Sequence, residues 1–506
     1  MAKYKKDESN QMVILPVSFE DQLVPGTLEF AIHTLVETRM DLSRFEDRYN
    51  NDETGRSAYD PKILLKIVLF GYSRGMMSSR RIEWACRKNV TFIALSGGQH
   101  PDHSTIAAFV SSMKDEILPL FRDVLLVCEE MDLLGGTFFA VDGLRLPSNA
   151  SKQWSGRRSE LEGRKQRLEA KVRGLLSEHT EQDKRDEDSP KGGSASGGLD
   201  RQKQIERLQK KADRIGKWLK ENEAKIGPRG KEITSNITDN ESAEMYTAHG
   251  IIQGYNGQAL VDSKHQVIIH GEAFGNSQDY EHVPPVLEGA KQNMKAIGHS
   301  EDYFKGAILT ADSNYHSRTN IGRCQDEGID AYIPDRFFRR RDPRYKPQRR
   351  YWPKRKNRFG LEAFTYEKET DRYVCPAGKY LRLKVRKVKI TGNLYRQYGG
   401  DEKDCCGCRL RPQCLRTKKV RYRTLNAPYG TDGINFSKQM VAKIDTEQGR
   451  KIYPQRLGII EPVFANIRVH KRLDRFTLRG KAKVNVQWLL YCMVHNIEKI
   501  LNYGFA

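Results

Sequence analysis

The chain has 506 residues and a formal net charge of +22. This length exceeds one ordinary hydrophobic core, so we expect several domains. The excess of Lys and Arg favours nucleic acid or another anionic surface as partner. No stretch approaches the ~20 apolar residues of a membrane span, and the N-terminal residues lack the apolar core of a secretion signal. We therefore expect a soluble intracellular protein that makes no use of a membrane.

Residues 1–135 are expected to form a helical domain. Pro61 opens a run of apolar residues at close to helical spacing. Ser78 and Ser79 are candidate N-caps for a second helix, and a third helix is expected to start within Asp102–Thr105. Short helices joined by turns fit a helix-turn-helix-like DNA-binding domain, and a helical packing domain with a solvated basic face is the alternative. The basic residues on the second helix are Arg80, Arg81, Arg87 and Lys88.

The central part of the chain alternates between strand and helix patterns. A strand is expected over 136–143, and apolar runs rich in Ile and Val flank a turn at 262–266, which predicts a hairpin. A helix, a buried strand, a helix and a short strand follow up to residue 335. This order predicts an α/β fold, a ribonuclease-H-like mixed sheet with helices on both faces. The core would comprise residues 136–156, 233–335 and 441–506.

Three acidic residues stand out. Asp142 and Asp312 each end an apolar run, and Glu461 lies in an amphipathic stretch near the C-terminus. The last residue of a buried strand can project into a crevice at the edge of a sheet. Hard carboxylate oxygens suit Mg²⁺, and two such ions can activate the attacking oxygen and stabilise the leaving one. Singly, each aspartate is an ordinary turn residue, but the trio on a basic chain indicates phosphodiester chemistry on nucleic acid.

Two insertions are expected to interrupt this core. Residues 157–232 predict a charged helical hairpin, with helices over 157–178 and 201–226 and a mobile loop over 183–198. Solvated helices without a specific ligand are the simpler account of the hairpin's charges. Residues 336–440 form a basic insertion that contains five cysteines.

The basic insertion begins with arginines interleaved with aromatic residues. Phosphate neutralisation combined with stacking is how proteins hold unpaired bases or single strands. The alternative is a solvated basic loop. The candidate DNA contacts are Arg339, Arg340, Arg341 and Trp352.

The cysteines of the same insertion suggest a second metal site. Cys405 and Cys408 form a C-x-x-C pair, and Cys375 and Cys414 complete a set of four sulfurs, with Cys406 spare or substituting. Zn²⁺ prefers four such ligands in structural sites. The alternative is a group of reduced, unliganded cysteines.

Several of these segments carry a family resemblance. They are AVDGLRLPSNAS around Asp142, GYNGQALVD, LTADSNYHS around Asp312, RLGIIEPVFANIR around Glu461, and PDHSTI in the helical N-terminal part. The chain resembles the DDE transposases of bacterial insertion sequences from about Val17 to Leu501. Within GYNGQALVD, Asn256 and Gln258 alternate along a strand and face either the metal crevice or the DNA, with a plain edge strand as the alternative.

The resemblance implies a function and a site. Asp142, Asp312 and Glu461 would hold catalytic Mg²⁺ or Mn²⁺. The enzyme would cut DNA at the terminal inverted repeats of a mobile element and transfer the strands to target DNA. It would act as a homodimer on DNA, in the bacterial cytoplasm at the nucleoid. The rival hypotheses are a ribonuclease-H-like structure-specific endonuclease and a transposase-derived DNA-binding protein that has lost catalysis.

One family pattern around the glutamate is only partly matched. Tyr453 and Arg456 have the family spacing, but four residues rather than three separate Arg456 from Glu461. A five-residue step does not return to the same helix face, which argues against Arg456 as an active-site member. Arg468 stands where the family has Lys, seven residues after the glutamate, and is a candidate DNA contact at the site or at the surface. Pro462 predicts a kink or a helix start.

Overall fold

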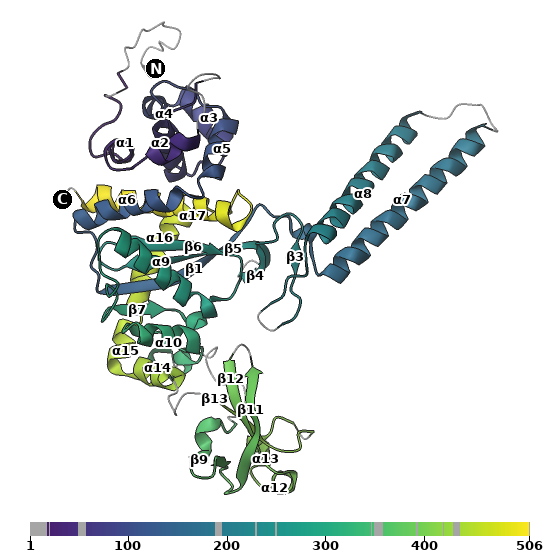
Figure 1. Cartoon of the computed structure of the whole chain (residues 1–506), viewed down its shortest axis with the longest axis vertical. Helices are drawn as coiled ribbons and strands as arrows, with labels where there is room; N and C mark the ends of the chain where they lie inside the picture. The colour runs from purple at the N-terminus through teal and green to yellow at the C-terminus, as the bar shows by residue number, and fades with distance from the viewer. Residues whose placement is uncertain are drawn as a thin grey trace, which may run out of the picture.

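The computed structural model describes residues 18–504, apart from 20, 49–56, 188–194, 228–229, 248–249, 346, 349–357, 391–392, 418 and 429–435. A central α/β body carries a group of helices at one end, a long helical arm at the side and a small sheet at the other end (Figure 1). Within the described part of the chain, no helix has the length and apolar character that a membrane crossing requires. The candidate contact Trp352 lies outside the described residues.

The N-terminal segment is helical, as predicted. Its α-helices are α1 (Leu28–Thr38), α2 (Pro61–Ser73), α3 (Ser79–Lys88), α4 (Val90–Leu95), α5 (His103–Ser112) and α6 (Ile117–Glu130). Asp60 caps α2 and Asp102 caps α5, each through a side-chain oxygen that accepts a backbone N–H. Such caps satisfy amides that have no partner within the helix. Ser78 occupies the N-cap position of α3, but its side chain makes no capping hydrogen bond, so that prediction was wrong.

The central sheet is mixed, as predicted. Its strands are β1 (Phe138–Pro147), β4 (Ala243–Thr247), β5 (Gly250–Asp262), β6 (Ile268–Phe274), β7 (Ile308–Ala311) and β8 (Asp330–Tyr332). β1 runs antiparallel to β5 and parallel to β7, which in turn runs parallel to β8. β6 and β4 both pair antiparallel with β5, along successive parts of its other edge. The predicted strands are present in the predicted order, whereas β4 was not predicted.

Helices cover both faces of this sheet. The covering helices are α9 (Val283–Ala296), α10 (Arg318–Asp326), α16 (Gln455–Ala465) and α17 (Lys481–Tyr503). A Cβ on Gly271 of β6 would meet Cys492 and Trp488 of α17, whereas the ring of the preceding residue, His270, lies against Gly289 of α9. Because successive side chains point to opposite faces of a strand, α17 and α9 lie on opposite faces.

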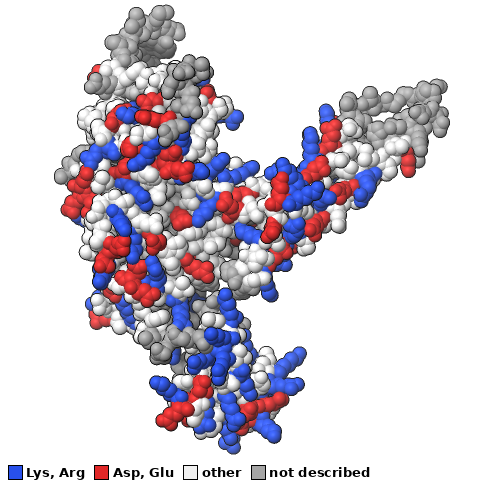
Figure 2. Space-filling view, in the orientation of Figure 1, with Lys and Arg blue, Asp and Glu red and all other residues white. Residues whose placement is uncertain are grey.

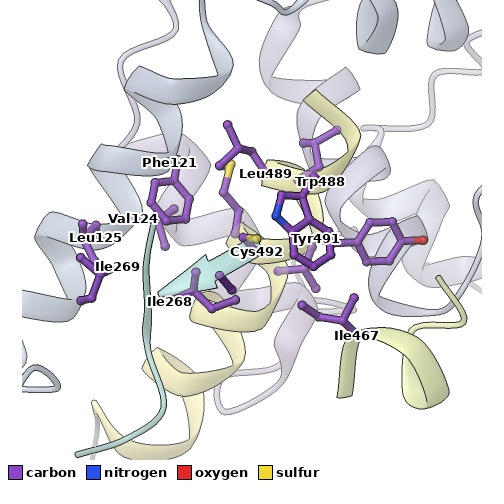
Figure 3. Packing of buried hydrophobic residues seen from close by; sticks show 14 of the residues in the cluster. Phe121, Val124, Leu125, Ile268, Ile269, Ile467, Trp488, Leu489, Tyr491 and Cys492 are labelled. Atoms are coloured by element: carbon purple, nitrogen blue, oxygen red, sulfur yellow. The ribbon is translucent and has the colours of Figure 1, made fainter. Parts of the chain in front are cut away.

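The apolar helix α17 lies at the centre of the main core (Figure 3). Its Trp488 donates a hydrogen bond from Nε1 to the carbonyl oxygen of Gln258 at 3.0 Å. Its Tyr491 stacks on Tyr72 of α2, with ring centroids 4.9 Å apart. One continuous apolar cluster therefore joins the N-terminal helices to the sheet, and each large side chain buried there contributes about 1.5–3 kcal/mol.

The helical arm consists of α7 (Arg158–Glu187) and α8 (Ala195–Glu221), which project side by side from the body (Figure 1). Their base is joined to the body by the short strands β2 (Ser155–Gly156) and β3 (Ser235–Asn236). Both helices run into 183–198, which was expected to be a mobile loop, so that expectation was wrong at its two ends. The apolar residues at the base are Leu161, Ile215, Trp218 and Leu219.

The basic insertion contains a small antiparallel sheet that was not predicted. Its strands are β9 (Thr365–Glu367), β10 (Arg372–Val374), β11 (Tyr380–Ile390), β12 (Asn393–Gly399) and β13 (Thr424–Pro428). In the space-filling view, Lys and Arg gather over this sheet (Figure 2). In the first part of β11, Lys and Arg alternate with apolar residues, which is the pattern of a half-buried strand. The core of the sheet consists of Phe364, Leu381, Tyr398, Leu425 and Ala427.

Short helices complete the region between the small sheet and α16. They are α11 (Phe338–Arg341), α12 (Glu402–Cys406), α13 (Arg411–Cys414), α14 (Phe436–Asp445) and α15 (Glu447–Ile452). α14 packs against α10 and β8 at the edge of the central sheet. A π-helical turn, Asn466–His470, follows α16 directly. Such turns often occur at functional sites, and this one lies next to the helix that carries Glu461.

Candidate active site and cysteine cluster

Strand register places Asp142 beside Asp312. The parallel pairing of β1 with β7 ends at Val141 opposite Ala311. Asp142 and Asp312 are the next residues on these two neighbouring strands, at the point where the strands separate. β1 itself continues to Pro147, so Asp142 lies within a strand and not at its end as predicted. Its pairing with Ala259 of β5 holds the backbone in place on the other side.

Both carboxyl groups have raised pKa values. Burial raises the pKa of Asp142 to about 6, and the charge of Asp312 adds to this shift, while Arg456 opposes it. Burial also raises the pKa of Asp312, against the opposing effects of the Asn314 backbone N–H and of Arg456. Two partly buried carboxyl groups side by side disfavour each other's charged form. A cation bound between them would remove this cost, and perturbed carboxyl groups of this kind are common at functional sites.

Arg456 is the cation that now faces the pair. Its Nη1 lies 2.5 Å from Oδ2 of Asp142, and its Nη2 lies 3.7 Å from Oε1 of Glu461. Its Nε is buried without a hydrogen-bond partner among the described residues. The argument from helical spacing against Arg456 was therefore wrong. Arg456 and Glu461 occupy different faces of α16, but the long arginine side chain extends far enough to meet both carboxylates.

Glu461 lies at the outer side of the site. Its side chain is 56% exposed, against 18% for Asp142. Among the described residues, no group of three or more His, Cys, Asp or Glu side chains is arranged closely enough to hold a metal ion. The structure thus brings Asp142 and Asp312 together and connects Glu461 to them through Arg456.

Pro462 lies inside α16 and not at its start. A proline cannot donate the hydrogen bond to the carbonyl four residues earlier, which here belongs to Gly458. That carbonyl oxygen instead accepts a hydrogen bond from Gln266 Nε2 at 2.9 Å. The side chain from the β5–β6 turn therefore supplies the missing partner and fastens the helix that carries Glu461 to the sheet.

A buried acidic residue that was not predicted, Asp279, adjoins the site. It accepts hydrogen bonds from Asn256 Nδ2 at 2.6 Å and Gln258 Nε2 at 3.0 Å, and pairs with Arg145 at 3.1 Å. Asn256 and Gln258 thus belong to a buried polar network around Asp279. Asp279 belongs to no apolar run, so nothing in the sequence pattern marks it.

The candidate DNA-contacting arginines differ in their surroundings. Arg339 and Arg340 are exposed on α11, and Arg468 is exposed on the π-helical turn after α16. Arg341 is held by two aspartates, with its Nη2 2.5 Å from Asp335 Oδ1 and its Nε 2.5 Å from Asp445 Oδ2. Its charge is therefore balanced within the protein.

The four candidate zinc ligands surround one cavity of about 40 Å³ in the small sheet. Burial raises the pKa values of the Cys405 and Cys414 thiols, and the other cysteines add to both shifts. Cys375 Sγ accepts the backbone N–H of Lys379 at 3.3 Å. Cys406 is exposed and does not line the cavity. Although the other four line it, these described cysteines do not come close enough together to form a metal-binding group, so the zinc site stays a prediction.

Two family models match this chain, one in its N-terminal part and one in its C-terminal part. A family model described as "Transposase DDE domain" matches residues 374–501, which include Glu461 and α17. A model described as "Transposase domain (DUF772)" matches residues 17–112 in the helical N-terminal part. A search of curated proteins finds no match. Two transposase family models thus match separate parts of the chain, and together they support a DDE transposase of an insertion sequence.

Proposed function

We propose that this transposase cuts DNA at the ends of its insertion sequence and joins the freed strand to target DNA, using Asp142, Asp312 and Glu461. The observation that carries the proposal is the parallel register that makes Asp142 and Asp312 neighbours across β1 and β7. The site is open to solvent on the side of Glu461, which leaves room for a large substrate, and divalent cations held by the carboxylates would offset the negative charge of DNA.

The order of the strands supports a ribonuclease-H-like core for this reaction. The central strand β1 has the antiparallel strand β5 on one side, with β6 antiparallel to β5 beyond it, and the parallel strands β7 and β8 on the other side. The proposed core comprises residues 136–156, 233–335 and 441–506. The arm within 157–232 and the small sheet within 336–440 are insertions into it. The helices within 1–135 are the proposed DNA-binding domain.

The donor set of the site fits Mg²⁺ or Mn²⁺. Carboxylate oxygens are the ligands these ions prefer. Burial raises the pKa values of Asp142 and Asp312, and a bound cation would favour their charged forms. Bound there, the ions would supply activation of the attacking oxygen and stabilisation of the leaving one. Glu461 is exposed enough to move onto them.

Arg456 has two parts in the proposed reaction. In the free protein it balances Asp142 and Glu461. Its unpartnered Nε also makes it a donor for a phosphate oxygen, since a guanidinium carries several N–H groups in a fixed geometry. We infer that Arg456 turns part of its hydrogen bonding from the carboxylates to the DNA backbone when substrate enters.

Further DNA contacts are proposed around this crevice. Arg339 and Arg340 are exposed on α11, which packs against α14, and Arg468 is exposed just after α16. These three cations would neutralise phosphates near the cleaved end. Trp352 keeps its proposed stacking role, outside the described residues. Two element ends have to be joined together, so we propose that the protein acts as a homodimer on DNA.

We also infer a structural Zn²⁺ held by Cys375, Cys405, Cys408 and Cys414. Four sulfurs around one small cavity are the donor set of a closed zinc site. The loops that carry them are held firmly, since Arg411 donates to the carbonyl oxygen of Cys405 at 2.8 Å and Arg423 to that of Cys414 at 2.9 Å. The core of the small sheet has few large side chains, so a metal would add stability that a small core lacks.

A strand-transfer assay tests the proposed function. The full chain is incubated with Mg²⁺, DNA carrying the ends that flank its own gene, and a supercoiled target plasmid. The expected products are nicks at the element ends and covalent joints between these ends and the plasmid. Cleavage without joints would instead favour the structure-specific endonuclease, and DNA binding without cleavage would favour a transposase-derived binding protein.

A further inference from the structure

A buried polar network lies behind the acidic pair. Gly143 and Arg145 of β1 pair with Gln258 and Asn256 of β5, so their side chains share one face of the sheet. Asn256 and Gln258 have no exposed area. A Cβ at Gly143 would clash with Gln258 Nε2 and Asn256 Oδ1. Only glycine therefore leaves room for the two amides next to Asp142.

Asp279 is the centre of this network. It lies on the short 3-10 helix Asp279–Glu281 and is 6% exposed. Burial by itself would raise its pKa. The neighbouring His282 ring, whose Nδ1 lies 3.6 Å from Oδ1, the hydrogen bond from Asn256 and the charge of Arg145 outweigh burial and lower the pKa. A carboxylate that is charged and hydrogen-bonded on several sides is held in one orientation. It therefore orients the amides that donate to it.

The amide of Gln258 connects Asp279 to the turn that begins at Asp312. Because its Nε2 donates to Asp279, its Oε1 points away and accepts the hydroxyl hydrogen of Tyr315. Tyr315 is fully buried and ends the 3-10 helix Ser313–Tyr315. Asp312 caps that helix, with its Oδ1 accepting the Asn314 N–H at 2.7 Å. One short turn therefore carries the candidate metal ligand Asp312 at its start and Tyr315, which joins the buried network, at its end.

We propose that Tyr315, Gln258 and Asp279 are positioning residues that fix the Asp312 carboxylate beside Asp142. The inference rests on the proposed function, because it takes these two aspartates as ligands of the divalent ions. Groups behind metal ligands typically change metal affinity or activity by about 10–100-fold. The substitution Tyr315→Phe tests this role, because it keeps the buried ring and removes only the hydroxyl that donates to Gln258.

Binding of Mn²⁺ to the full chain tests the proposal by calorimetry. We expect Tyr315→Phe to weaken Mn²⁺ binding by about tenfold or more, with unchanged affinity for DNA. The matched control is Tyr255→Phe. Tyr255 is also fully buried, and its hydroxyl donates to a buried carboxylate, that of Asp239, at 2.8 Å. The control loses an equivalent hydrogen bond away from the acidic pair and should bind Mn²⁺ like the wild type.

Three results would contradict the expectation in different ways. Unchanged Mn²⁺ affinity in Tyr315→Phe overturns the positioning role and leaves the proposed active site intact. An equal loss in Tyr315→Phe and Tyr255→Phe also overturns it, because it would reflect general loosening of the fold. A wild-type chain that binds no Mn²⁺, with or without DNA, overturns the metal site itself and the inference with it.

Discussion

The guanidinium of Arg456 lies 2.5 Å from the carboxylate of Asp142, although 314 residues separate them in sequence. This pair occupies the position at which a divalent cation would neutralise the same carboxylate. Ion pairs of this burial are costly to break from one side, because the remaining charge is left without a partner. The site is thus stabilised by a protein cation in the free enzyme, and any metal has to compete with it.

Arg456→Ala should therefore make the fold more dependent on metal. Without metal, we expect a loss of about 1–3 kcal/mol of unfolding free energy, since the buried carboxylate loses its partner. Addition of Mn²⁺ should raise the melting temperature more in the variant than in the wild type, because no guanidinium has to be displaced. Thermal unfolding in chelator and in Mn²⁺ measures both effects.

The matched control for this experiment is Arg341→Ala. This substitution also removes an arginine that pairs with two carboxylates, those of Asp335 and Asp445. The melting temperature of the variant should therefore fall as well. Its response to Mn²⁺ should stay that of the wild type. Equal responses in Arg456→Ala and the wild type would contradict the competition between Arg456 and metal.

Asp142→Asn should remove cleavage and leave DNA binding intact. A neutral amide is a poor Mg²⁺ ligand, and loss of a direct ligand should exceed the roughly 100-fold effect of losing a group behind one. The control is Asp123→Asn on α6, whose carboxyl is buried to a similar degree, with 21% of the side chain exposed. A gel assay of nicked element ends reports cleavage, and Asp142→Asn with wild-type cleavage would remove Asp142 from the site.

The exposed and the ion-paired arginines of α11 should behave differently. Arg339→Ala combined with Arg340→Ala should weaken DNA binding and lower the slope of affinity against salt by roughly one for each phosphate that is no longer neutralised. Arg341→Ala should mainly lower stability, by about 1–3 kcal/mol. Binding titrations at several salt concentrations, with denaturant unfolding, distinguish the two. An unchanged salt slope in the double variant would show that these arginines do not bind phosphates.

The purified chain should contain about one zinc ion, as measured by elemental analysis. Cys408→Ser should lose the ion and unfold the small sheet, since binding free energy at such a site is folding free energy. Cys406→Ser is the matched control: its thiol is exposed and does not line the cavity, so zinc content should be unchanged. A folded small sheet without zinc would rule the site out.

The elements that could be predicted from the sequence are those with a clear apolar pattern. β1, β5 and β7 are apolar runs bounded by turn residues, and α17 is apolar over most of its length. β11 has such a pattern as well, since Leu381, Leu383 and Val385 alternate with Arg382, Lys384 and Arg386, so this strand was predictable from its sequence. Its partners β9 and β10 are only three residues long each, which is too short for a clear alternation.

The candidate site was partly predictable for a related reason. Asp142 and Asp312 follow apolar runs, which marks them locally, and their adjacency comes from the register of β1 with β7. Arg456 was set aside because helical periodicity describes where a Cβ points and not how far a long side chain reaches. No local sequence pattern identifies Asp279. Its role depends on the hydrogen bonds that it accepts from Asn256 and Gln258, which come near it only in the folded protein.

His495 of α17 should make the fold sensitive to acid. Its side chain is 1% exposed, its Nε2 lies 2.9 Å from the carbonyl oxygen of Gln266, and Asn466 donates to its Nδ1 at 3.0 Å. Burial lowers its pKa to about 3, and the charges of Lys471 and Lys499 add to this shift. The neutral ring fits both hydrogen bonds, whereas a protonated ring would place a second proton against the amide of Asn466.

The sign of the effect follows from this lowered pKa. The contribution of neutral His495 to stability is fully present above the unfolded-state pKa of about 6.5, and it is lost as the pH falls from there toward the folded-state value. At about 1.36 kcal/mol per pH unit, the loss should reach about 2 kcal/mol at pH 5. Asp142, with its pKa raised to about 6, acts in the opposite direction over part of this range, so the wild type alone does not isolate the histidine.

A comparison with His495→Gln isolates it. Glutamine does not titrate, so the unfolding free energy of the variant should depend less on pH between 6.5 and 5 than that of the wild type. Every other titratable group acts alike in both proteins. Urea unfolding of the two proteins at several pH values gives the difference. We expect that difference to change by about 2 kcal/mol in favour of the variant as the pH falls to 5. A difference that stays constant over this range would mean that His495 keeps an ordinary pKa and that protons reach its ring in the folded state.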